Sequence, residues 1–299
     1  MKKSLLVIAI VICLLSSSLM LFACDSKGTI DTSTVVDIEV YEFYGFEVKP
    51  TSTTTAILTN YTGKLTEFSF PEKVVMNSKE YTITELDANL FKEDKRITKV
   101  VLPSTLIKIG DYTFTGCTNL KDLIIPDGVT EIGSYAFSGC QSFKNITIPE
   151  SVKTLGVAVF SSCSNLETIN IPDAITSIGQ SMFSGCIKLE QIDIPENVKT
   201  IEYSAFQNCS TLNTIRIPEG VTTISDSLFA GCTSLTTISL PSTITSFGMY
   251  SFSNCTQLTI VNFENTKLKY AGINKYSNYY KQGVPSNCIV RCTDGDTTF

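Results

Sequence analysis

The chemistry-bearing residues that stand out in this chain are its cysteines. Seven of the 11 recur every 23 residues: Cys117, Cys140, Cys163, Cys186, Cys209, Cys232 and Cys255. Thiols can bind metals or form disulfides, but a metal site needs ligands that converge on one point. The fixed period instead places one thiol in each row of a column, with parallel directions that fit the disulfide torsion poorly. We interpret the column as a ladder of buried free thiols, which pack as small apolar groups.

Other catalytic groups are scarce. The sequence has no histidine, so the commonest general base and the commonest metal ligand are missing. Glu167, Glu190 and Asp193 fall at outward positions of neighbouring rows and could form an acid pair like that of a glycosidase. We prefer to interpret them as phased surface charge and keep a carboxylate-based hydrolase as a remote alternative. We expect no enzymatic activity, no cofactor and no metal site.

Two more cysteines, Cys288 and Cys292, lie outside the period. If residues 286–292 form a strand, positions four apart are separated by roughly 13 Å, which is too far for a disulfide. Packing in a terminal cap is the preferred interpretation, and a redox pair is the alternative.

The elements that must position these residues are units of 23 residues, a period typical of a solenoid in which each unit covers its neighbours. In the unit 120–142, apolar residues at Leu120, Leu123 and Ile125 predict a strand whose intervening residues face outward. Pro126 ends that strand because proline has no N–H for the ladder.

The second half of the unit has a different spacing. Its apolar residues recur at a spacing of three to four positions: Val129, Ile132, Ala136 and Phe137. This spacing predicts a turn or two of helix behind the strand. The frame extends over nine rows from Leu65 to Phe263, with a predicted hairpin near residues 77–80 and Asp94 in place of the first cysteine. We predict a repeat solenoid with a parallel β-sheet on its concave side, short helical or irregular turns behind it and a β-rich N-terminal cap.

The outward strand positions are where a partner would bind. They run from basic through acidic to hydroxyl-bearing residues, and we select as candidate contacts Lys121, Lys144, Glu167, Asn170, Glu190, Asp193 and Arg216. This face contains no aromatic residue, although aromatic side chains are common interface anchors. The face alone therefore predicts modest affinity, unless many copies act together.

The unit resembles the BspA type of leucine-rich repeat, also called the Treponema pallidum type. The resemblance rests on Ile-Pro after the strand, an Ile-Gly step, a Phe-x-x-Cys segment and the 23-residue length, and it covers about residues 64–263. The family includes bacterial surface proteins and lipoproteins associated with adhesion to host matrix proteins or to other bacteria. The resemblance therefore implies a surface protein whose partners are proteins.

The first 24 residues have the layout of a secretory signal: Lys2 and Lys3, then an uncharged apolar run, then a cleavage-like end. That end, Ala23-Cys24 followed by polar residues, resembles a bacterial lipobox, which implies that Cys24 carries a lipid and anchors the protein in the cell envelope. An ordinary cleaved signal and a transmembrane anchor are the alternatives. Residues 25–34 then read as a polar tether and residues 35–63 as the N-terminal β cap.

Residues 264–299 follow the last repeat and are predicted to form a C-terminal cap. This segment holds a tyrosine cluster interspersed with lysines, and we select it as a second candidate contact patch: Tyr276, Tyr279 and Tyr280. Packing within the cap is the alternative interpretation.

Composition limits the classes of partner. The chain is 43% hydrophobic with a net charge of −6, which argues against nucleic acid because phosphates are normally held by clustered Lys and Arg. We expect a lipid-anchored surface protein that binds host matrix proteins or bacterial surface proteins. An envelope repeat protein with a structural role and no dedicated ligand is the alternative.

Overall fold

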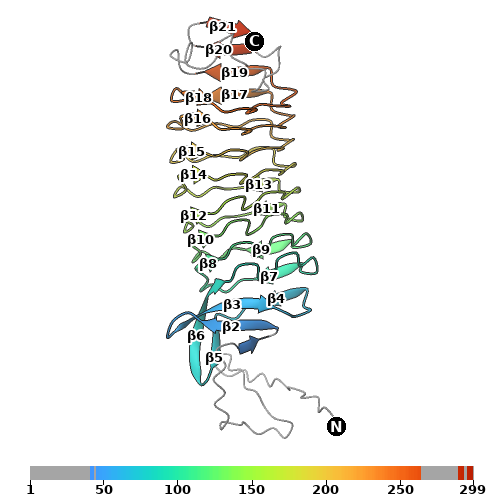
Figure 1. Cartoon of the computed structure of the whole chain (residues 1–299), viewed down its shortest axis with the longest axis vertical. Helices are drawn as coiled ribbons and strands as arrows, with labels where there is room; N and C mark the ends of the chain where they lie inside the picture. Colours follow the sequence, from blue (N-terminus) through green and yellow to red (C-terminus); the bar gives the residue numbers. More distant parts are fainter. Residues whose placement is uncertain (1–40, 44, 264–288, 293–294, 299) are drawn as a thin grey trace.

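The structure, a computed structural model, describes residues 41–43, 45–263, 289–292 and 295–298. These residues form an elongated stack of chain turns, with β1 to β6 at one end and β19 to β21 at the other (Figure 1). Strands of successive turns pair in parallel, and the described residues contain no helix. The predicted solenoid is confirmed.

The first strand column consists of the segments with the pattern apolar-x-x-apolar-x-apolar. Its strands are β4 (Glu67–Ser69), β7 (Lys99–Val101), β9 (Asp122–Ile124), β11 (Asn145–Ile146), β13 (Thr168–Ile169), β17 (Thr237–Leu240) and β19 (Ile260–Phe263). Within the repeats the register places equivalent positions opposite each other, as in Val100 with Leu123 and Ile146 with Ile169. An isolated bridge between Arg216 and Ser239 belongs to the same column. The sequence period therefore fixes which residues become neighbours.

A second strand column lies where the sequence predicted a helical turn. Its strands are β6 (Lys79–Leu86), β8 (Lys108–Ile109), β10 (Glu131–Ile132), β12 (Thr154–Leu155), β14 (Ser177–Ile178), β15 (Thr200–Ile201), β16 (Thr223–Ile224) and β18 (Ser246–Phe247). They pair in parallel, for example β8 with β10 and β10 with β12. The prediction of a helical turn in this half of the unit was wrong. The other predicted possibility, irregular turns, holds only for the segment that follows each of these strands.

That following segment is a column of turns, and its hydrogen bonds explain why it is not helical. The main-chain N–H of Tyr112 donates to the oxygen of Ser134 at 2.8 Å, and that of Phe114 donates to Ala136 at 2.8 Å. Both bonds connect one row to the next, whereas a helix would bond each N–H four residues back. Tyr112 also has a φ of 57°, which interrupts any helical run.

The core lies between these columns and contains two ladders. Rings of successive rows stack with centroids 5.1 to 6.0 Å apart and planes inclined by 4° to 19°, in the order Phe91, Phe114, Phe137, Phe160, Phe183, Phe206, Phe229 and Phe252. The seven phased cysteines are buried and free, which confirms the predicted thiol ladder. Identical residues stack because each row repeats the conformation of the previous one.

Antiparallel strands precede the first repeat. β1 (Tyr41–Phe43), β2 (Phe46–Pro50) and β3 (Thr55–Tyr61) form a meander whose last strand pairs in parallel with β6. The hairpin predicted near residues 77–80 is confirmed, since β5 (Lys73–Met76) pairs antiparallel with β6. Its two turn residues, Asn77 and Ser78, both have positive φ, as a tight hairpin turn requires.

Aromatic side chains of this meander cover the open end of the phenylalanine ladder. Phe46 is buried, stacks on Tyr61 at 4.4 Å and contacts the ring of Phe91 at 5.6 Å. Tyr61 itself lies 5.4 Å from Phe91. Without these rings the terminal phenylalanine would face water, so this end of the stack is capped by packing.

At the other end, the first column continues beyond the last repeat. β20 (Ile289–Cys292) pairs in parallel with β19, and β21 (Gly295–Thr298) pairs antiparallel with β20. Cys292 lies in β20, whereas Cys288 lies outside the described residues.

Candidate functional site

The candidate site is the outer face of the first strand column. Inward positions such as Ile146 and Ile169 are buried, and the positions between them point to solvent. Six of the seven selected contacts are exposed: Lys121, Lys144, Glu167, Glu190, Asp193 and Arg216. The fold therefore brings the variable residues of successive rows onto one face.

Asn170 is the exception among the selected residues. Its Oδ1 accepts a hydrogen bond from the main-chain N–H of Ile148 at 2.8 Å, and its Nδ2 donates to the oxygen of Ile148 at 2.8 Å. The amide group thus pairs with the backbone of the preceding row and is only half-exposed. Asn170 stabilises the join between two rows, a role that its sequence position did not reveal.

Charged side chains follow one another in strict order on this face. Lys121, Lys144, Glu167 and Glu190 occupy the same position of four consecutive rows. Main-chain hydrogen bonds fix that order, including one of 2.7 Å from the N–H of Glu167 to the oxygen of Lys144. Among the described residues, these four side chains form no ion pair. Their charges remain available to a partner.

A groove of about 330 Å³ lies further along the same face. Thr214, Arg216, Thr237 and Ser239 contribute to its lining, and the guanidinium of Arg216 pairs with the carboxylate of Glu196. The groove offers hydroxyl groups, the guanidinium of Arg216 and the carboxylate of Glu219. This set suits polar recognition of a protein surface more than enclosure of a small molecule.

Two exposed apolar residues were missed in the selection. Val101 in β7 and Ile124 in β9 are neighbours across the column, with exposed fractions of 46% and 82%. The sequence signal was an apolar residue at the fifth strand position, where the later rows carry polar or charged groups. Exposed side chains of this kind can serve as interface anchors.

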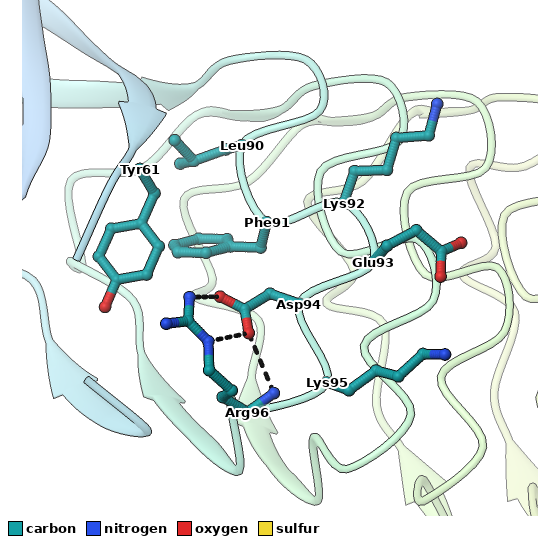
Figure 2. A pocket seen from close by; sticks show the side chains of 8 residues that line it. All are labelled: Tyr61, Leu90, Phe91, Lys92, Glu93, Asp94, Lys95 and Arg96. Carbon is teal, nitrogen blue, oxygen red and sulfur yellow. Dashed lines mark hydrogen bonds and ion pairs between the residues drawn. The ribbon is translucent and has the colours of Figure 1, made fainter. Parts of the chain in front are cut away.

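A second depression, of about 590 Å³, lies beside the N-terminal cap. Figure 2 shows the carboxylate of Asp94 facing the guanidinium of Arg96, with the rings of Tyr61 and Phe91 beside them. Asp94 accepts hydrogen bonds from Arg96 Nη2 at 2.6 Å, from Nε at 2.9 Å and from the main-chain N–H at 3.0 Å.

These contacts settle the state of Asp94. Burial acts to raise the pKa of Asp94, but the hydrogen bonds and charge of Arg96 outweigh it and hold the pKa below its ordinary value. Asp94 replaces the first thiol of the ladder at the point where the core meets solvent. Its charge is compensated by Arg96, so we assign this depression a structural role.

The thiol ladder offers no reactive nucleophile. Burial raises the pKa of Cys117, Cys163 and Cys209 to about 12, and it raises the pKa of Cys140 and Cys186 well above the ordinary value. A thiol of this kind stays protonated at neutral pH and is inaccessible to substrates. The described part of the chain contains no group of three potential metal ligands among His, Cys, Asp and Glu.

Several predicted residues lie outside the described ranges: Cys24, Tyr276, Tyr279, Tyr280 and Cys288. Within the described ranges, no helix is long and apolar enough to cross a membrane.

Two strand columns, a phased apolar core and a variable outer face define a solenoid of the leucine-rich-repeat class. The BspA type leucine rich repeat region matches residues 84–213 and 176–283 in six copies. The chain belongs to this family. No curated protein was found to match it.

Solved structures of bacterial leucine-rich-repeat proteins are similar to this chain. One from Bacteroides ovatus is 25% identical with a TM-score of 0.57, covering 85% of this chain and 76% of its own. A leucine-rich cell surface protein from Faecalibacterium prausnitzii is 26% identical with a TM-score of 0.55, covering 76% and 77%. The leucine-rich-repeat protein of T. pallidum is 28% identical with a TM-score of 0.50, covering 77% and 95%.

Proposed function

We propose that the chain is a bacterial cell-surface adhesion protein that binds other proteins through the outer face of its first strand column. The observation that carries this proposal is the contrast between the two sides of each row. The inward positions repeat with little change, whereas the outward positions differ in charge and size from row to row. A rigid scaffold with a variable face is suited to recognising macromolecules.

Two further arguments support binding rather than catalysis. The sequence lacks histidine, and the thiols of the ladder are buried and protonated. One similar structure is described as a cell surface protein, which favours the same location for this chain. The partner classes that we propose are host matrix proteins and proteins on other bacteria.

The proposed location depends on the N-terminal segment. We propose that Cys24 is lipidated after cleavage and that residues 25–34 tether the solenoid to the envelope, since several acyl chains would anchor it stably. Labelling with radioactive palmitate in a bacterial host should be lost in Cys24→Ala and retained in Cys13→Ala, whose cysteine lies inside the apolar run. Equal labelling of both variants would contradict the lipid anchor.

The binding function is tested with full-length protein in detergent on immobilised laminin, collagen and fibronectin, and on intact bacteria. We expect saturable binding to at least one probe. The triple variant Glu167→Gln, Asp193→Asn, Arg216→Gln should reduce that binding. A matched control with the same net charge change places exposed substitutions off the face: Asp127→Asn, Asp173→Asn and Lys153→Gln.

The outcomes distinguish binding through the first strand column from binding through another part of the protein. Equal binding by the triple variant and its control would remove the first column from the proposal and direct attention to the tyrosine patch at Tyr276, Tyr279 and Tyr280. Absence of saturable binding to every probe would contradict adhesion and favour a structural role in the envelope.

A further inference from the structure

The charges on the outer face have an inverted symmetry. At the second strand position, six consecutive rows carry a polar residue, two lysines, two glutamates and a polar residue: Thr98, Lys121, Lys144, Glu167, Glu190 and Asn213. Reading this series backwards exchanges every lysine for a glutamate. The centre of inversion lies between the rows of Lys144 and Glu167.

The main chain holds this series in register. The N–H of Lys121 donates to the oxygen of Thr98 at 3.0 Å, and the N–H of Asn213 donates to the oxygen of Glu190 at 3.1 Å. Neighbouring strands are about 4.8 Å apart, so Lys121 and Glu190, three rows apart, are separated by about 14 Å along the stack. The four charged side chains are exposed. The main chain therefore holds a solvent-facing row of four charges in a fixed order.

A second copy of the chain is complementary to this row in one orientation. When a second solenoid faces the first about a two-fold axis parallel to the strands, its rows run in the opposite direction. Lys144 then lies opposite Glu167 of the second copy, and Lys121 lies opposite Glu190 of the second copy. Each pairing occurs twice by symmetry, which gives four ion pairs.

The alternative symmetric orientation is disfavoured. An axis parallel to the stack would place each row opposite itself with its strand direction reversed. An axis over the second strand position then sets Lys144 against Lys144 and Glu167 against Glu167, and no placement of this axis sets the lysine rows against the glutamate rows. Like charges in direct opposition are destabilising at an interface. The order of charges thus selects the antiparallel arrangement of the two stacks.

Most of the other outward residues would face compatible side chains in this arrangement. Asn145 lies opposite Thr168 of the second copy, and Val101 lies opposite Arg216, whose alkyl stem can cover an apolar side chain. Ile124 would face Asp193 of the second copy, which is a mismatch and limits the affinity.

We propose, building on the adhesive function of this face, that its partner is a second copy of the same chain on a neighbouring cell, bound antiparallel through these four ion pairs. Each exposed ion pair contributes little to the affinity, because solvent competes for both charges. A single pair of molecules therefore binds weakly, and many copies displayed on two facing membranes give the necessary avidity. Salt weakens the contact because exposed charges are screened.

The test uses charge reversal in full-length protein reconstituted into neutral phosphatidylcholine liposomes of two colours. Wild-type liposomes should co-aggregate at about 20 mM salt and disperse at about 500 mM. Lys121→Glu liposomes alone and Glu190→Lys liposomes alone should stay dispersed, because each reversal places like charges opposite each other twice. Mixing these two populations should restore co-aggregation to at least about tenfold above either alone.

The mixture should co-aggregate because the two residues in each of its four facing pairs again have opposite charges. The double variant Lys121→Glu, Glu190→Lys should likewise aggregate with itself and not with wild type, which shows that neither substitution acts by disrupting the fold. Lys153→Glu and Asp127→Lys reverse exposed charges off this face and should aggregate like wild type.

The proposal is overturned if the two reversal variants fail to cross-aggregate, or if each alone aggregates like wild type. It is also overturned if wild-type liposomes stay dispersed at low salt while the protein still binds a matrix probe, in which case adhesion to other proteins stands. Loss of matrix binding together with intact cross-aggregation would leave the second copy as the partner.

Discussion

The Sγ of Cys163 donates a hydrogen bond to the main-chain oxygen of Phe137 in the preceding row, at a distance of 3.2 Å. The same oxygen accepts a bond from the N–H of Cys140 at 3.1 Å. The bond from the thiol recurs for all seven cysteines of the ladder, each to the phenylalanine oxygen of the preceding row. Each thiol therefore links its row to the main chain of the preceding row as a second donor to the phenylalanine oxygen.

Removing one ladder thiol should destabilise the fold. Cys163→Ala deletes a buried group and leaves the oxygen of Phe137 without its second donor, which costs about 1–3 kcal/mol. Urea unfolding should show a lower midpoint for this variant. The exposed substitution Thr154→Ala is the control and should change stability by less than about 0.5 kcal/mol. Equal midpoints for Cys163→Ala and wild type would contradict a role for the thiol bond.

High pH should weaken the fold through the same thiols. Burial raises the pKa of Cys163 and Cys209 to about 12, whereas the pKa of an unfolded thiol is about 8.5. The stability from these groups is complete below about pH 8.5 and is lost as pH rises toward 12, because the unfolded chain releases protons that the folded chain keeps. The urea midpoint should fall between about pH 8.5 and 11, and less steeply in a Cys163→Ala, Cys209→Ala variant. Identical slopes would refute the linkage.

Ser251 offers a stabilising substitution. Its hydroxyl is buried and has no hydrogen-bond partner among the described residues, at a position where other rows carry Ala205 or Leu228. Ser251→Ala should raise stability by up to about 1 kcal/mol, because it removes the cost of an unpaired polar group. Thr113 occupies the equivalent position and donates to the oxygen of Gly110 at 2.7 Å, so Thr113→Ala should destabilise. Thermal unfolding of both variants measures the two changes in stability. Changes of the same sign would contradict this explanation.

Ile124 should matter for binding and not for stability. With 82% of its surface exposed, Ile124→Ser should change the free energy of unfolding by less than about 0.5 kcal/mol. Binding to a matrix probe should weaken because the variant loses an exposed apolar anchor. Liposome aggregation should persist because Ile124 would face Asp193 of the second copy. Ile107→Ser is the control, since Ile107 is also exposed but lies next to the second column. Equal loss of probe binding in both variants would show that the position carries no specificity.

Much of this molecule is determined by its sequence. The 23-residue period alone places Cys140 above Cys117 and Phe137 above Phe114, because equivalent residues of a solenoid become neighbours. The same period determined the order of charges from Lys121 to Glu190, and the extra residues before Glu80 indicated the hairpin. These features follow from spacing, and they needed no knowledge of how each half-unit folds.

Only the tertiary structure decided the conformation of the second half of each unit. The spacing of Val129, Ile132 and Ala136 fits a helix or a strand with a turn equally well, since a short apolar pattern does not distinguish them. The hydrogen bonds that decide between them connect different rows, such as Phe114 to Ala136, and are formed only when the stack assembles. For the same reason the sequence placed Asn170 among the contacts, whereas in the fold its amide binds the backbone of Ile148.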